Sequence, residues 1–185
     1  MKVLALSGSL RRDSYNTKLV HAAARLLPEG AELELWDRLR EVPPYDEDDD
    51  VEPAPAAVAE LRDAIAGADA ILFATPEYNS SIPGQLKNAL DWASRPFPDN
   101  VLREKPSAVI GASTGLFGAV WAQAEVRKAL KASGAHVLDS ELPVGMADFA
   151  FGPDDTLADP ELGARLGDLV GDLVREVGSP VEQSA

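Results

Sequence analysis

Residues 7–17 carry a group of side chains that is suited to holding a phosphate. The segment follows a short apolar run, which predicts a buried strand, and leads into an amphipathic helix with apolar positions at Leu19, Val20 and Ala23. Its hydroxyl, amide and guanidinium groups belong to Ser7, Ser9, Arg11, Ser14, Asn16 and Thr17. Since the first turn of a helix also offers free backbone N–H groups, the sequence predicts an anion site here, with a phosphorylated cofactor as its occupant.

A simpler interpretation is that Ser14 only caps the helix. Capping accounts for Ser14 but not for the other hydroxyls and the arginine in the same segment. Two familiar nucleotide motifs are absent: the segment has one glycine where G-x-G-x-x-G needs three, and it lacks the G-K-[ST] of a P-loop. The pattern therefore favours a terminal monophosphate over a dinucleotide.

A second loop, residues 75–84, is stiffened by two prolines. Tyr78 and Asn79 can border a flat ring and form hydrogen bonds with its polar edge. Glu77 has two interpretations. As a catalytic acid or base it would need a raised pKa. As a structural residue it would accept hydrogen bonds from backbone amides or from an arginine of a partner subunit, and we favour this second role.

Helix and strand patterns alternate along the chain and predict where these loops meet. The expected strands are residues 3–6, 31–36, 70–74, 108–112 and 136–144. The sequence thus predicts an α/β fold, a doubly wound five-stranded parallel sheet of order 2-1-3-4-5 with helices on both faces, which makes three layers. We expect one domain over residues 1–178 and a frayed tail over residues 179–185.

In this strand order the winding reverses between strands one and three, and ligands bind at the carboxyl ends of such strands. The two loops described above meet there with a third, residues 113–118, whose glycines let the backbone approach a ligand closely. On its own this third loop is also compatible with an ordinary strand-to-helix turn.

Composition narrows the class of protein. A net charge of −14 argues against nucleic acid or an acidic membrane as partner, and the absence of cysteine excludes a thiol nucleophile and thiolate metal sites. With two histidines a metal site is not expected, and the acidic run at residues 46–50 favours a solvated loop over a calcium site. No stretch is long enough to span a membrane, and the N-terminus lacks a secretory pattern, so we expect a cytoplasmic protein.

Three motifs resemble the NADPH-dependent FMN reductase family, a flavodoxin-like branch that includes bacterial quinone and chromate reductases. The first is Gly8-Ser9-Leu10-Arg11 with Ser14, Asn16 and Leu19. The second, long and highly specific, runs from Thr75-Pro76-Glu77-Tyr78-Asn79 through Leu86-Lys87-Asn88-Ala89 to Asp91-Trp92. The third joins Lys105-Pro106 to Gly111-Ala112-Ser113, Gly115 and Gly118. They occur in the family's order and cover residues 1 to about 134.

The resemblance implies FMN as cofactor and NADPH or NADH as co-substrate. The residues that match the family's phosphate-binding positions are Ser9, Arg11, Ser14, Asn16 and Thr17. Those that match its loop beside the isoalloxazine ring are Pro76, Glu77, Tyr78 and Asn79, and those of its third loop are Ser113 and Gly115. The family often has an arginine after the third loop, whereas Ala119-Val120-Trp121 stands here, which leaves the choice between NADPH and NADH open.

The family also implies a ping-pong reaction, in which NAD(P)H gives a hydride to FMN before a quinone, a flavin or a similar acceptor is reduced. We therefore expect no catalytic acid or base. Family members are usually homodimers or homotetramers, and Trp92 and Arg95 are our candidates for a subunit contact. An electron carrier that binds FMN without turning over NAD(P)H is the main alternative, and a Rossmann dehydrogenase is disfavoured by the missing glycines.

Overall fold

A computed structural model describes residues 1–178, so the tail predicted at residues 179–185 lies outside the described residues. The chain forms a five-stranded sheet of order β2-β1-β3-β4-β5 in which every neighbouring pair is parallel. The strands are β1 (Lys2–Ser7), β2 (Glu32–Trp36), β3 (Ala70–Thr75), β4 (Pro106–Ala112) and β5 (His136–Val144). The predicted fold and strand order are confirmed.

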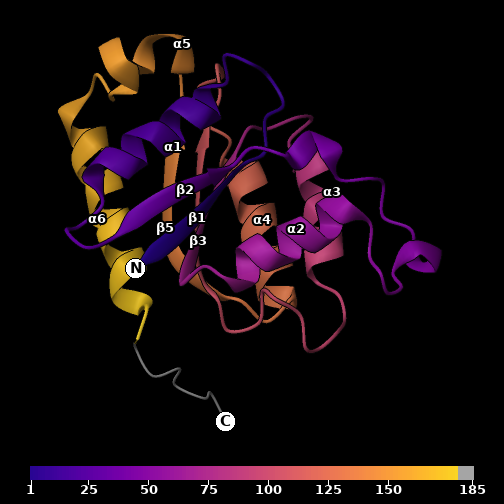
Figure 1. Cartoon of the computed structure of the whole chain (residues 1–185). Helices are drawn as coiled ribbons and strands as arrows, with labels where there is room; N and C mark the ends of the chain where they lie inside the picture. The colour runs from indigo at the N-terminus through magenta and orange to yellow at the C-terminus, as the bar shows by residue number, and fades with distance from the viewer. Residues whose placement is uncertain (179–185) are drawn as a thin grey trace.

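Helices cover both faces of the sheet (Figure 1). The α-helices are α1 (Tyr15–Leu26), α2 (Ala56–Ala66), α3 (Gly84–Ala93), α4 (Val120–Ala132), α5 (Ala147–Ala150) and α6 (Pro160–Glu176). Short 3₁₀ turns, η1 (Leu39–Glu41), η2 (Glu47–Asp49) and η3 (Pro153–Asp155), interrupt the loops. Among residues 1–178, no helix is long and apolar enough to cross a lipid bilayer.

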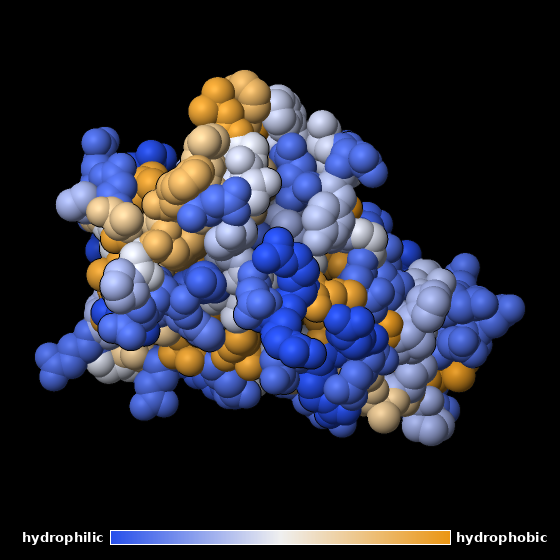
Figure 2. Space-filling view, turned by 90° about the horizontal axis from the view of Figure 1, so that it is seen from above, coloured by the Kyte–Doolittle hydropathy of each residue, from blue (hydrophilic) through white to orange (hydrophobic). Residues whose placement is uncertain are grey.

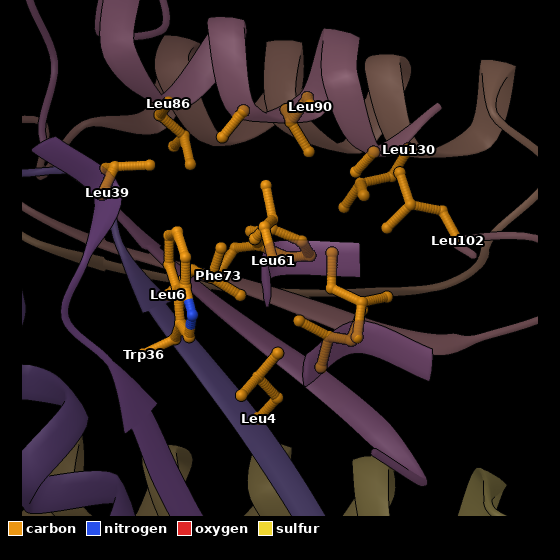
Figure 3. Packing of buried hydrophobic residues seen from close by; sticks show 14 of the residues in the cluster. Leu4, Leu6, Trp36, Leu39, Leu61, Phe73, Leu86, Leu90, Leu102 and Leu130 are labelled. Carbon is orange, nitrogen blue, oxygen red and sulfur yellow. The ribbon is translucent and has the colours of Figure 1, made fainter. Parts of the chain in front are cut away.

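The central strands β1, β3 and β4 are buried along nearly their whole length, because both of their faces are covered. On one face, side chains of α2, α3 and α4 such as Leu61, Leu90 and Leu130 pack toward Leu6 and Phe73 of the sheet (Figure 3). On the other face, α1 and α6 cover a second apolar layer. Edge strand β2 alternates exposed and half-buried residues up to Trp36, as its sequence predicts.

All five strands point the same way, so their carboxyl ends form one edge of the sheet. This edge lies uppermost in Figure 1, where α5 follows the end of β5. The loops after β1, β3 and β4 all begin there, which places the three sequence motifs together.

Candidate active site

A cavity of about 140 Å³ opens at the carboxyl edge of the sheet, between the ends of β1, β3 and β4. It is lined by Ser9, Arg11, Ser14, Tyr15, Asn16, Pro76, Glu77, Tyr78, Ala112, Ser113 and Thr114. The structure thus brings together most of the predicted site residues, drawn from three loops. Thr17, Asn79 and Gly115 are predicted site residues that do not line this cavity.

The first loop is shaped mainly by its own neighbours. The hydroxyl oxygen of Ser14 accepts hydrogen bonds from the backbone N–H groups of Asn16 and Thr17, at 3.2 and 3.3 Å, so Ser14 does cap α1. The Arg11 guanidinium is exposed, donates to the carbonyl of Asp13 at 3.0 Å and lies 5.5 Å from the ring centroid of Tyr15. An exposed guanidinium group, that of Arg11, and the two hydroxyl-bearing residues Ser9 and Ser14 therefore line the cavity.

The side chain of Asn16 lines the cavity and also has a structural role that the sequence did not indicate. It is 2 % exposed, and its amide exchanges two hydrogen bonds of 2.9 Å with the backbone of Ala112, accepting from the N–H and donating to the carbonyl. This pairing fastens the first turn of α1 to the end of β4. One amide N–H is left for a ligand, so the main role of Asn16 is to hold the first and third loops together.

Thr17 borders a neighbouring cavity of about 170 Å³, on the β2 side of the first loop. Its hydroxyl donates to that of Ser7 at 3.1 Å. Ser9 and Arg11 line both cavities, so the first loop forms the wall between them. The hydroxyl-bearing residues of the motif are consequently divided between two cavities: Ser14 lines the first, Ser7 and Thr17 line the second, and Ser9 lines both.

The second loop turns back on itself at Asn79 and Ser80, which have φ angles of 54° and 59°. Backbone hydrogen bonds of 3.2 Å in both directions join Tyr78 to Ser81 across this turn. Asparagine tolerates a positive φ better than most residues, so Asn79 serves the turn, while the half-exposed ring of Tyr78 borders the cavity. The carboxylate of Glu77 accepts hydrogen bonds from two backbone amides of α4, which agrees with the structural role favoured above.

In the third loop, Ser113 lines the cavity while Gly115 is exposed beside it. Gly118 has a φ of 58°, and a Cβ atom there would lie 2.5 Å from the backbone of Pro143 and Val144. The need for glycine at residue 118 therefore comes from contact with β5, and not from a ligand as the sequence suggested.

Tyr15 is a lining residue that the sequence analysis missed. Its hydroxyl donates to Asp148 of α5 at 2.6 Å, which raises the pKa of Tyr15, and its ring stacks on that of Phe151 at 5.9 Å. The position of Tyr15 directly after the helix cap Ser14 was only a weak indication in the sequence that its ring lines the cavity. Nothing local to Tyr15 pointed to Asp148, which lies 133 residues away in the chain.

The prediction that Trp92 makes a subunit contact is wrong. Its side chain is fully buried among core residues, and its indole N–H donates to the carbonyl of Pro43 at 2.9 Å. Arg95, half-buried, donates to the hydroxyl of Tyr45 at 3.2 Å. Tryptophan is common both in interfaces and in protein cores. Here the Trp92 side chain belongs to the apolar core between the sheet and helices α2 and α3.

Known proteins share both the sequence and the fold. Residues 1–148 match the family of NADPH-dependent FMN reductases. The chain is 45% identical over 160 residues to an NAD(P)H-dependent FMN reductase of Pseudomonas aeruginosa, with 86% of this chain and 85% of that protein covered. It is 34% identical to a quinone reductase of Escherichia coli K12, with 88% and 84% covered. FerB, a flavoenzyme NAD(P)H:(acceptor) oxidoreductase of Paracoccus denitrificans, superposes with a TM-score of 0.84 at 35% identity, with 96% and 97% of the two chains covered.

The chain is a flavodoxin-like α/β protein with a cavity at the point where the winding of its sheet reverses. The chain belongs to the NADPH-dependent FMN reductase family. It is therefore an oxidoreductase with FMN as cofactor and NAD(P)H as electron donor, and the alternative of a carrier without NAD(P)H turnover is not favoured.

Proposed function

We propose that this chain reduces small quinone-type acceptors at the expense of NAD(P)H, with FMN seated in the cavity at the carboxyl edge of the sheet. The observation that carries the proposal is that three loops, each matching one family motif, line a single cavity. Relatives named quinone reductases, from Escherichia coli and Pseudomonas putida, support the acceptor class. Bound FMN supplies the redox chemistry, taking a hydride from NAD(P)H and passing the electrons to the acceptor.

The first loop holds the phosphate end of the cofactor in this proposal. Arg11 exchanges its bond to the Asp13 carbonyl for a charge-assisted bond to phosphate, which is stronger than a bond between neutral groups. The hydroxyls of Ser9 and Ser14 and the remaining N–H of Asn16 complete the donor set in this cavity. Thr17, on the other side of the first loop, stays a predicted phosphate ligand that this cavity does not include. The start of α1 adds a favourable field for an anion.

The second and third loops border the flat ring. Pro76 and Tyr78 of the second loop and Ser113 of the third loop line the cavity. The exposed Gly115 lies close to Ser113. Asn79 keeps the second loop in place through its turn. Glu77 is the carboxylate among the lining residues. Because it accepts hydrogen bonds from backbone N–H groups of α4, we assign the site no acid–base catalyst.

A binding and turnover experiment tests the proposal. Purified protein mixed with FMN should quench the flavin fluorescence. Without oxygen, the complex should oxidise one equivalent of NADPH or NADH per FMN, and it should continue to turn over only when benzoquinone or a similar acceptor is present. Running both nucleotides side by side settles the preference that the sequence leaves open. A protein that binds no FMN, or whose FMN complex leaves both nucleotides unoxidised with every quinone offered, would contradict the proposal.

We also propose that the chain assembles as a homodimer or homotetramer through an apolar rim beside the third loop. This rim consists of the exposed side chains of Leu116, Phe117, Trp121, Met146 and Phe149. Figure 2 shows apolar surface gathered along one side of the face that carries the site. Exposed aromatic groups of this kind mark protein–protein contacts. Light scattering should give a mass of two or four chains, and Phe117→Ser should lower it.

Two further expectations stay predictions. One FMN-binding domain over residues 1–178 predicts a single cooperative unfolding transition, which calorimetry would measure. A cytoplasmic location would be tested by fractionating cells that produce the protein.

A further inference from the structure

The second loop is fastened to helix α4 by the side chain of Glu77. One oxygen of this carboxylate, Oε2, accepts hydrogen bonds of 3.1 Å from the backbone N–H groups of both Trp121 and Ala122. These residues are the second and third of α4, and amides in that position have no partner inside their own helix. Glu77 therefore satisfies two backbone donors that have no partner inside their own helix.

Helix α4 has no side-chain cap from its own sequence. The residue at its N-cap is Ala119, which has a φ of 62° and no side-chain hydrogen bond to offer. A carboxylate at the start of a helix is also favoured by the helix dipole. Glu77 takes over the capping role from another loop, 44 residues earlier in the chain than Trp121.

A second bond ties the same loop to the same helix. The hydroxyl of Ser81 donates to Oε2 of Glu125, in the second turn of α4, at 3.2 Å. The turn between Tyr78 and Ser81 is closed by its own backbone bonds, as described above. The segment 77–81 is thus a small closed unit whose two ends both rest on α4.

We propose that Glu77 is a positioning residue for the cofactor site: by capping α4 it fixes where Pro76 and Tyr78 stand relative to Ser113 and so sets the width of the cavity. This inference rests on the proposed FMN site. It also explains how a carboxylate is tolerated among the groups that line a site for an anionic cofactor, because its charge is taken up by the positive end of a helix.

The test compares Glu77→Ala and Glu77→Gln with the unaltered chain. The probe is FMN, with its dissociation constant measured by fluorescence quenching. Hydrogen exchange of the Trp121 and Ala122 amides is measured in the same proteins without FMN. We expect Glu77→Ala to weaken FMN binding about tenfold and to speed exchange at both amides about fivefold, the size of a lost helix cap. Glu77→Gln keeps an acceptor oxygen, so it should stay within about threefold of the unaltered chain in both measurements.

Asp159→Ala is the matched control. Asp159 caps α6 through its carboxylate, which accepts from the N–H of Glu161 at 2.9 Å, and it does not line the cavity. This variant loses a helix cap of the same kind, so it should lose similar stability while binding FMN unchanged. Weakened binding in Asp159→Ala would show that general loosening, and not positioning, explains the effect of Glu77.

Two results would overturn the inference. In the first, Glu77→Ala binds FMN as tightly as the unaltered chain. In the second, Glu77→Gln binds as weakly as Glu77→Ala while exchange at Trp121 and Ala122 is unchanged, which would mean that the negative charge acts on the cofactor directly. If Glu77→Ala does not fold, Glu77→Asp decides: its shorter side chain reaches the α4 amides less well, and unchanged FMN binding would overturn the inference. Failure of the unaltered chain to bind FMN would instead contradict the proposed function.

Discussion

Helices α1 and α4 are each capped by a side chain of a residue that lines the cavity, yet their first turns are stabilised in opposite ways. The start of α1 is capped by Ser14, the residue directly before it, through bonds that span two and three residues. The start of α4 is capped by Glu77, through bonds that span 44 and 45 residues. One end of the site is therefore formed locally and the other is assembled from distant parts of the chain.

This difference decides what a substitution at each place does. A change in the local cap affects mainly α1 and the groups next to it. A change in the distant contacts moves one loop relative to another, so it alters the cavity by more than the loss of the replaced side chain. The predictions below test this contrast, starting with the largest expected effect.

Replacing Gly118 by alanine should break the assembled end most severely. A left-handed φ costs a non-glycine residue about 1–2 kcal/mol, and the added Cβ would press on the backbone of β5. We expect the free energy of unfolding, measured in urea, to fall by about 3 kcal/mol. Gly115→Ala is the control, because its Cβ would come no nearer than 3.6 Å to any atom and should leave stability unchanged.

Replacing Asn16 by alanine should remove the two hydrogen bonds that join the first turn of α1 to the end of β4. The N–H and carbonyl of Ala112 would lose their buried partner, which predicts a loss of about 2 kcal/mol in the free energy of unfolding. Urea denaturation measures this loss. Asn16→Asp should fare no better, because a carboxylate has no N–H for the Ala112 carbonyl. An Asn16→Ala protein as stable as the unaltered chain would show that the bonds to Ala112 contribute little to holding α1 in place.

Replacing Arg11 by alanine should leave the fold intact and weaken cofactor binding. Its side chain is exposed and bonds to its own loop, so the melting temperature should not change. Loss of one charge-assisted bond to phosphate predicts about tenfold to thirtyfold weaker FMN binding, measured by fluorescence quenching. The neighbouring Arg12 is also exposed and lies outside the cavity lining, so Arg12→Ala should bind FMN nearly as well as the unaltered chain.

Replacing Ser14 by alanine should lower the free energy of unfolding by about 1 kcal/mol, the usual cost of a lost cap. Hydrogen exchange should increase at Asn16 and Thr17 and remain unchanged at Trp121 and Ala122. Equal changes at the two helices would contradict the contrast between a local and an assembled end.

The same contrast explains how far the sequence could predict the molecule. Strand order followed from apolar runs and from one half-polar strand, because burial imposes these patterns directly. Ser14 was predicted as a cap because capping depends on adjacent residues. The partners of Asn16, Tyr15 and Glu77 could not be predicted, since each lies on an element that reaches the site only through the tertiary fold. The prediction of a subunit contact at Trp92 was wrong for a related reason, because tryptophan is common both in cores and in interfaces.

The bond between Asn16 and Ala112 also bears on when the site comes into being during synthesis. A ribosome releases the chain from its N-terminus, so the first strand and helix emerge 96 residues before the backbone group that Asn16 needs. A nascent chain that stops short of β4 would contain the serines and the arginine of the first loop, but it would lack the Ala112 backbone that holds this loop against the third loop. Capture of the flavin should therefore be a late event in biogenesis.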